Sequence, residues 1–84
     1  MIGVRQAVEA AVSYVREFQE LIPPREMRLE ETESLDSGDW QITLSFLENP
    51  ISGQRSYKSF LIDKDTAEIK SMKVRSIAAA RLVG

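Results

Sequence analysis

The sequence predicts an α+β domain in which one N-terminal helix packs on a four-stranded antiparallel β-meander. Apolar residues recur at helical spacing near the start of the chain, and apolar and polar residues alternate almost perfectly from Trp40 to Leu47. Two further strand-like runs flank a polar turn at residues 63–68. One helix followed by sequential strands with short connections favours a meander with the helix across one face.

The helix is expected at about residues 3–21. Pro23-Pro24 ends it, because proline lacks an amide donor and disfavours helical geometry in the residue before it. Since this is the only apolar layer able to cover a sheet, we expect its apolar stripe to face the core. The stripe consists of Val4, Ala7, Val8, Ala11, Val15, Phe18 and Ile22.

The first strand is expected at residues 26–35, where the alternation is imperfect. Strict alternation would place Glu31 and Glu33 on the same face as Leu29. A β-bulge near Glu30–Glu31 would instead turn Thr32 to that face. In both cases the glutamates are typical of an edge strand that is guarded against aggregation.

The clearest strand covers residues 40–47 and follows a turn at residues 36–39. Its alternation is typical of a half-buried strand in an antiparallel sheet. Residues 48–55 are expected to form a loop, because they contain Asn49-Pro50 and Ser52-Gly53. The apolar side of the strand carries Trp40, Ile42, Leu44 and Phe46, and the polar side carries Gln41, Thr43 and Ser45.

The third and fourth strands are expected at residues 56–63 and 68–75. In the fourth strand Ile69 is out of phase with the other apolar residues, and a bulge near Lys70–Ser71 would bring it into line. The alanine-rich residues 76–84 are expected to form a short helix or a frayed tail. The expected core comprises Phe18, Trp40, Leu44, Phe46, Phe60 and Met72.

The composition excludes several classes of chemistry. The 84 residues suffice for a single domain spanning 1–84, and they include no cysteine and no histidine. Disulfides, thiolate or imidazole zinc sites, and nucleophile systems built on histidine are therefore excluded. A calcium loop at residues 63–68 would need an oxygen ligand in place of Ala67 and a glycine in place of Glu68. We expect no catalysis, no metal and no cofactor.

Charge is distributed unevenly along the chain. Residues 1–48 carry ten acids and four bases, giving −6, whereas residues 49–84 carry three acids and seven bases, giving +4. The acidic total argues against nucleic-acid binding, and no apolar run approaches the roughly 18 residues of a membrane span. The acidic first strand and the basic fourth strand, with Lys70, Lys73 and Arg75, raise the alternative of a homodimer through the sheet edges.

Three segments resemble the PepSY-like, cystatin-like group of small bacterial α+β domains, over about residues 4–75. They are the spaced alanines Ala7 and Ala11, the strand Trp40–Leu44, and the hairpin Ile62–Ile69, which is close to the strand–Asp-x-x-Thr-Gly-Glu-Val turn of that group. The resemblance implies a binding or peptidase-inhibiting module that is not a catalyst. Ala67 replaces the usual glycine, so either a left-handed residue at this position would be strained or the turn would be differently shaped.

We therefore expect a small cytoplasmic domain that binds a protein or peptide, with an inhibitory or accessory role as its specific form. The alternatives are a self-associating assembly or immunity-type protein, and an enzyme that uses Glu31 and Glu33 in a deep pocket. The partner surface is expected on the open sheet face and on the loop after the second strand. The open face comprises Gln41, Thr43, Ser45, Leu47, Tyr57 and Leu61. The candidate partner-binding residues are Leu47, Ile51, Gln54, Arg55, Tyr57 and Leu61.

Overall fold

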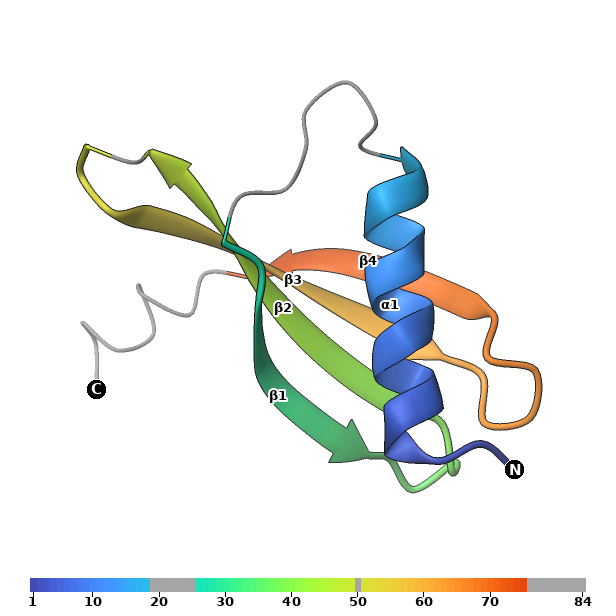
Figure 1. Ribbon diagram of the computed structural model, residues 1–84. Helices are drawn as coiled ribbons and strands as arrows, with labels where there is room; N and C mark the ends of the chain where they lie inside the picture. Colours follow the sequence, from blue (N-terminus) through green and yellow to red (C-terminus); the bar gives the residue numbers. More distant parts are fainter. Residues whose placement is uncertain (19–25, 50, 76–84) are drawn as a thin grey trace.

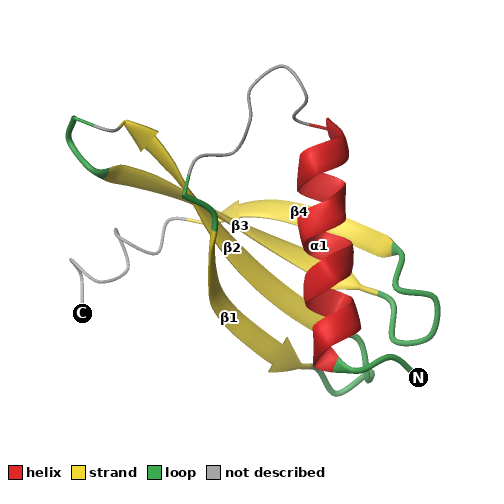
Figure 2. Cartoon of the chain, in the orientation of Figure 1, coloured by secondary structure: helices red, strands yellow, loops and turns green. Residues whose placement is uncertain are grey.

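The computed structural model describes residues 1–18, 26–49 and 51–75. These residues form one helix and one antiparallel sheet with the strand order β1-β2-β3-β4. The helix lies across one face of the sheet (Figures 1 and 2), so the predicted fold class is confirmed. The elements are α1 (Val4–Phe18), β1 (Arg28–Ser34), β2 (Trp40–Asn49), β3 (Gln54–Ile62) and β4 (Ile69–Arg75).

Helix α1 begins after Gly3, whose carbonyl accepts a hydrogen bond of 3.1 Å from the amide of Ala7. The side chain of Gln6 reaches back to accept a 3.1 Å bond from the Gly3 amide. This is one half of a capping box, and it satisfies an amide that the helix leaves unpaired. The predicted residues 19–21 lie outside the described residues. Within the described ranges, the structure contains no helix with the length and apolarity needed to cross a membrane.

The core lies between α1 and the two central strands. Ala7, Ala11 and Val15 are buried on the helix, and their small size lets the helix approach the sheet closely. The ring of Tyr14 meets Phe60 edge-on, with the ring centroids 5.8 Å apart. The buried hydrophobic residues of the sheet are Ile42, Leu44, Phe46, Phe60 and Ile62, all of them on β2 and β3.

The expected core is confirmed for Leu44, Phe46 and Phe60. Trp40 packs against the core and is half-buried, and its indole N–H donates to the carbonyl of Ile2. The prediction for Met72 is wrong, because 41% of this residue is exposed. Met72 lies on the outer strand β4, beyond the strands that supply the buried layer. The side chain of Phe18 lies outside the described residues.

Both outer strands contain a bulge at the places where the sequence left one open. In β1 the register shifts between Leu29 and Glu31, so that Leu29 and Thr32 lie opposite residues of the buried face of β2. In β4 the shift skips Lys70 and aligns Ile69 with Ile62.

The sheet has two faces, which we call the helix face, toward α1, and the far face, away from α1. Glu31 and Glu33 belong to the far face.

The β2–β3 hairpin extends beyond the other two strands (Figure 1). Strand β1 pairs with β2 only as far as Ser45, and β4 pairs with β3 only as far as Tyr57. Residues 46–49 and 54–56 thus pair only with one another among the described residues. We call residues 46–49 and 51–56 the arm. The predicted loop at residues 48–55 is wrong in extent, because main-chain pairing continues to Asn49 and resumes at Gln54.

Candidate functional site

The predicted partner-binding residues gather on the far face and on the arm. Leu47 lies opposite Arg55, and Tyr57 and Leu61 follow on the far face of β3. Leu47, Tyr57 and Leu61 are half-buried. Ile51, in the turn that ends the arm, is 96% exposed, and Gln54 is also exposed. Leu47, Arg55, Tyr57 and Leu61 thus form a stripe on the far face, and Ile51 and Gln54 lie beyond it at the end of the arm.

The centre of the far face is closed, which corrects the predicted open surface. Thr43 and Ser45 are completely buried, and Ser59 is 7% exposed. The hydroxyls of Thr43 and Ser59 are 2.8 Å apart across β2 and β3 and form a hydrogen bond. Thr43 and Ser45 were both expected to contact a partner, and neither is accessible. They are buried because longer side chains from other strands lie over them.

Arg75 and Glu31 provide one such cover. The guanidinium of Arg75 lies 3.0 Å from the Glu31 carboxylate and donates a 3.3 Å bond to the Ser59 hydroxyl. Strands β1 and β4 are separated by three strand spacings, or about 14 Å, so both side chains must lie across the sheet to meet. The pair is 38% and 52% exposed, and we expect it to contribute at most about 1 kcal/mol. The main effect of the pair is therefore that its side chains cover the centre of the far face.

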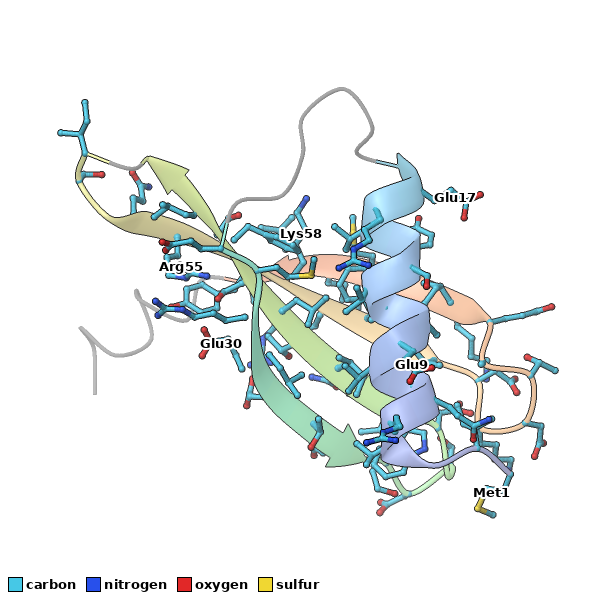
Figure 3. All side chains as sticks on the ribbon, viewed as in Figure 1. Met1, Glu9, Glu17, Glu30, Arg55 and Lys58 are labelled. Carbon is cyan, nitrogen blue, oxygen red and sulfur yellow. The ribbon has the colours of Figure 1, made fainter. Side chains whose placement is uncertain are left out.

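Arg55 provides the second cover and holds the base of the arm (Figure 3). Only 12% of its side chain is exposed. Its Nε donates to the Ser45 hydroxyl at 3.0 Å, and one terminal nitrogen donates to the carbonyls of Ser45 and Glu26. The other terminal nitrogen lies 3.6 Å from the Glu26 carboxylate. Arg55 was predicted to bind a partner, but these donors are engaged within the chain.

Ser45 links this anchor to the bulge of β1. Its hydroxyl donates a 2.6 Å hydrogen bond to the carboxylate of Glu30, the extra residue of the bulge. A bulge leaves one residue out of the ladder and re-aims its side chain. Here the re-aimed carboxylate reaches the buried hydroxyl that also accepts from Arg55. The arm, the bulge and strand β2 thus share one polar contact network, and sequence reasoning missed it.

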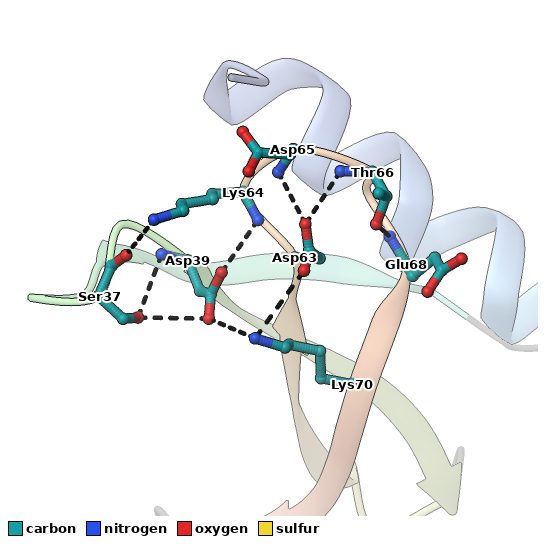
Figure 4. A network of polar contacts seen from close by, with 8 residues as sticks. All are labelled: Ser37, Asp39, Asp63, Lys64, Asp65, Thr66, Glu68 and Lys70. Atoms are coloured by element: carbon teal, nitrogen blue, oxygen red, sulfur yellow. Dashed lines mark hydrogen bonds and ion pairs between the residues drawn. The ribbon is translucent and has the colours of Figure 1, made fainter.

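A second polar network joins the two turns at the opposite end of the sheet (Figure 4). The Asp39 carboxylate lies 2.9 Å from the ammonium of Lys70 and accepts a 3.0 Å bond from the amide of Lys64. The bond from Lys70, followed by that from the Lys64 amide, lowers the pKa of Asp39. The same bond raises the pKa of Lys70. Lys70 also lies 3.9 Å from Asp63, so it bridges two carboxylates.

The turn at residues 63–68 is held by hydrogen bonds from its backbone amides to the side chain of Asp63. The Asp63 carboxylate accepts bonds from the amides of Thr66, at 3.0 Å, and Asp65, at 2.8 Å, and these bonds lower the pKa of Asp63. Ala67 has a φ of 64°, so of the two alternatives left open by the sequence the structure shows the left-handed residue rather than a differently shaped turn. The left-handed conformation costs a residue with a Cβ atom, such as alanine, about 1–2 kcal/mol, whereas glycine adopts it without this cost. The described residues contain no group of three or more side chains arranged to hold a metal ion.

The glutamates of β1 do not form an enclosed site. Glu31 and Glu33 are both exposed, and Glu31 is paired with Arg75. Acid–base work by paired carboxylates needs burial and a cleft that holds a substrate. Neither of these two residues is buried, so the carboxylate-pair reading gains no support from them.

The sheet edges expose apolar residues that sequence reasoning did not assign to a surface. On the helix face of β4, Met72 is 41% and Val74 is 71% exposed. On the helix face of β1, Leu29 is 50% exposed. The sequence did contain a signal for this exposure. It predicts a single helix, and one helix is too narrow to cover all four strands, so apolar residues of the outer strands stay exposed.

Comparisons of the chain with protein-family models, curated proteins and solved structures found no match. The likeness to PepSY-like and cystatin-like domains thus remains a resemblance carried by the residues quoted for it.

Proposed function

We propose that this chain is a protein- or peptide-binding domain that contacts its partner through the arm and the adjoining stripe of the far face. The observation that carries the proposal is Ile51, which is 96% exposed at the end of a two-stranded ribbon that reaches beyond the rest of the sheet. Single exposed apolar residues are common on proteins. Here Leu47, Tyr57 and Leu61 continue the apolar character inward along one face.

The anchoring of the arm supports a binding role. An isolated two-stranded hairpin is at best marginally stable in water. Arg55 ties the base of this one to Ser45 and to the backbone of Glu26, and we expect these bonds to hold the arm in place before a partner arrives. A pre-ordered loop loses less conformational entropy on binding, which raises affinity without adding contacts.

The specific form of the proposal is an inhibitory or accessory role toward a peptidase, as the resemblance implies. In this form the domain is cytoplasmic, as expected from the sequence, and it binds its partner without catalysing a reaction. A panel of peptidases assayed with the wild-type domain and with Ile51→Asp tests this form. Inhibition by the wild type that Ile51→Asp loses supports it.

The test of the general proposal is quantitative capture from extracts of the native host with matched baits. Ile51→Asp places a charge at the end of the arm, and Val74→Asp places one at an exposed apolar residue of β4. Burying an isoleucine contributes about 1.5–3 kcal/mol, so the arm variant should lose roughly 10-fold or more in affinity. A partner should be enriched by the wild type and by Val74→Asp and depleted with Ile51→Asp. Equal capture by all three folded baits would contradict the proposal.

A further inference from the structure

The two outer strands present edges of opposite character. Strands β1 and β4 have seven residues each, and neither has a further strand beside it within the described ranges. An unpaired strand edge offers a row of N–H and C=O groups to another chain.

The side chains of the two edges complement each other on both faces of the sheet. On the helix face, β4 exposes Met72 and Val74, and β1 exposes Leu29. On the far face, Lys73 is exposed on β4, and Glu33 is exposed on β1. Apolar and oppositely charged cross-strand pairs stabilise an antiparallel ladder, whereas like charges placed opposite each other destabilise it. Pairing β1 with β1 would oppose glutamates, and pairing β4 with β4 would oppose lysines.

Strand direction is consistent with the same match. Neighbouring strands alternate in direction, so β1 and β4 run in opposite senses. When β1 of a second copy is added antiparallel to β4, the sheet continues with both α1 helices on one side. The helix faces of the two copies then coincide, and so do their far faces. In the register that places Lys73 opposite Glu33, Val74 lies opposite Thr32 and diagonal to Leu29, so a charge pair and an apolar contact form across the same ladder.

We propose that β4 of one molecule pairs with β1 of a second copy of this chain, in a head-to-tail contact. Each contact leaves a free β1 at one end and a free β4 at the other, so the contact is heterologous and does not close as a two-fold dimer. The charge complementarity of the edges thus leads to open-ended assembly, in place of the homodimer that the sequence raised as an alternative. The contact is independent of the arm.

The same edges show why the association is weak. The bulges at Glu30 and Lys70 interrupt regular pairing on both strands. Glu31 and Arg75 are already paired within each molecule, which leaves Lys73 and Glu33 to form the charge contact between copies. Exposed charge pairs are screened over about 8–10 Å near physiological salt, so added salt weakens the contact. We expect a dissociation constant of about 0.1–1 mM for the contact between two copies.

Sedimentation of paired edge-blocked variants tests the proposal. Successive amides of a strand point to opposite edges, so one of Lys73→Pro and Val74→Pro removes only an outward donor. The same holds for Thr32→Pro and Glu33→Pro on β1. Thermal melting identifies the tolerated member of each pair. Each tolerated variant alone should stay monomeric, and an equimolar mixture should form a 1:1 complex that does not grow, because it contains one intact β4 and one intact β1.

Three outcomes would overturn the proposal. They are a wild-type protein that is monomeric at every concentration and salt, a wild-type complex that stops at two copies, and a mixture of blocked variants that stays monomeric while the wild type associates. Ile51→Asp serves as the control and should leave the wild-type mass distribution unchanged. If it abolishes association, the contact runs through the arm, and the edge pairing is wrong. Failure of the edge pairing leaves capture of a partner by the arm unaffected.

Discussion

Replacing Arg55 with methionine tests whether its guanidinium holds the arm to the sheet. Methionine keeps most of the apolar stem and removes the charged donors. In the native chain the guanidinium donates to the Ser45 hydroxyl, the Ser45 carbonyl and the Glu26 carbonyl, and it lies 3.6 Å from the Glu26 carboxylate. The variant therefore leaves the acceptors on Ser45 without this donor.

The magnitude follows from these contacts. A hydrogen bond that involves a charged group contributes about 1.5–3 kcal/mol, and an ion pair to an exposed carboxylate contributes at most about 1 kcal/mol. The contacts share one ordered side chain, so their contributions overlap rather than add. We expect Arg55→Met to lower the free energy of unfolding by about 2–4 kcal/mol. For a domain of this size, that corresponds to a Tm lower by roughly 10–30 °C.

The assay is thermal unfolding followed by circular dichroism, with Arg16→Met as the matched control. Arg16 is exposed on α1, where a surface substitution changes stability by no more than about 0.5 kcal/mol. If Arg55→Met melts as close to the wild type as Arg16→Met does, the guanidinium does not anchor the arm. Arg55 would then return to the residues available to a partner, as the sequence alone suggests.

Four further predictions concern packing, turns, acid stability and metals. Phe46→Ala should cost about 3–5 kcal/mol, since Phe46 is 6% exposed, and a melting temperature near that of the wild type would place this residue at the surface. Gly38→Ala should destabilise more than Gly53→Ala: both glycines have positive φ, but only at Gly38 would the added methyl meet a side-chain atom, at 2.9 Å. Equal losses would show that the contact is relieved at no cost. Asp39 and Asp63 have pKa values below the ordinary 3.8 in the folded state, so the stability they contribute is present above that value and is lost as the pH falls through the folded values. Asp39→Asn should therefore flatten the loss of Tm in acid, and an unchanged slope would contradict this origin. Titration calorimetry with calcium, zinc or magnesium should give no saturable heat, and a site tighter than about 1 μM would contradict the expected absence of metal.

The elements could be predicted because they depend on local periodicity, and the same periodicity showed where a bulge was one of the open alternatives. Side chains alternate strictly along a strand, so an apolar residue that is out of phase, such as Ile69, requires an extra residue nearby. The structure places that extra residue at Lys70, and the corresponding one of β1 at Glu30. The conformation of Ala67 was left open by the sequence, because alanine in place of the usual glycine allows either a strained left-handed residue or a different turn, and the structure has the former.

The closed centre of the far face could not be predicted from any one strand. The polar alternation of Thr43 and Ser45 is typical of a solvated face. Their burial depends on Arg55 and Arg75, which belong to other strands and reach the centre only in the folded register. Contacts of this kind depend on the length and direction of single side chains, and neither quantity appears in a pattern of apolar and polar residues.

The extent of the arm was missed for a different reason. Asn49-Pro50 and Ser52-Gly53 are typical turn residues, so they predict a loop over the whole segment. Pairing in a two-stranded ribbon relies on main-chain hydrogen bonds, which leave little trace in the side-chain pattern. Leu47, Tyr57 and Ile51, three apolar residues of the candidate site, lie on the arm and the adjoining far face, and the projection of the arm was not predicted.

The most direct test of the arm as the binding surface is photo-crosslinking in cells of the native host. A photoreactive amino acid replaces Ile51 in one variant, and Glu9, an exposed residue of α1, in the other. Binding through the arm predicts a defined adduct with another polypeptide from position 51 and none from position 9. If position 51 gives no adduct, or if both positions give the same adducts, the arm is not the surface that contacts a partner.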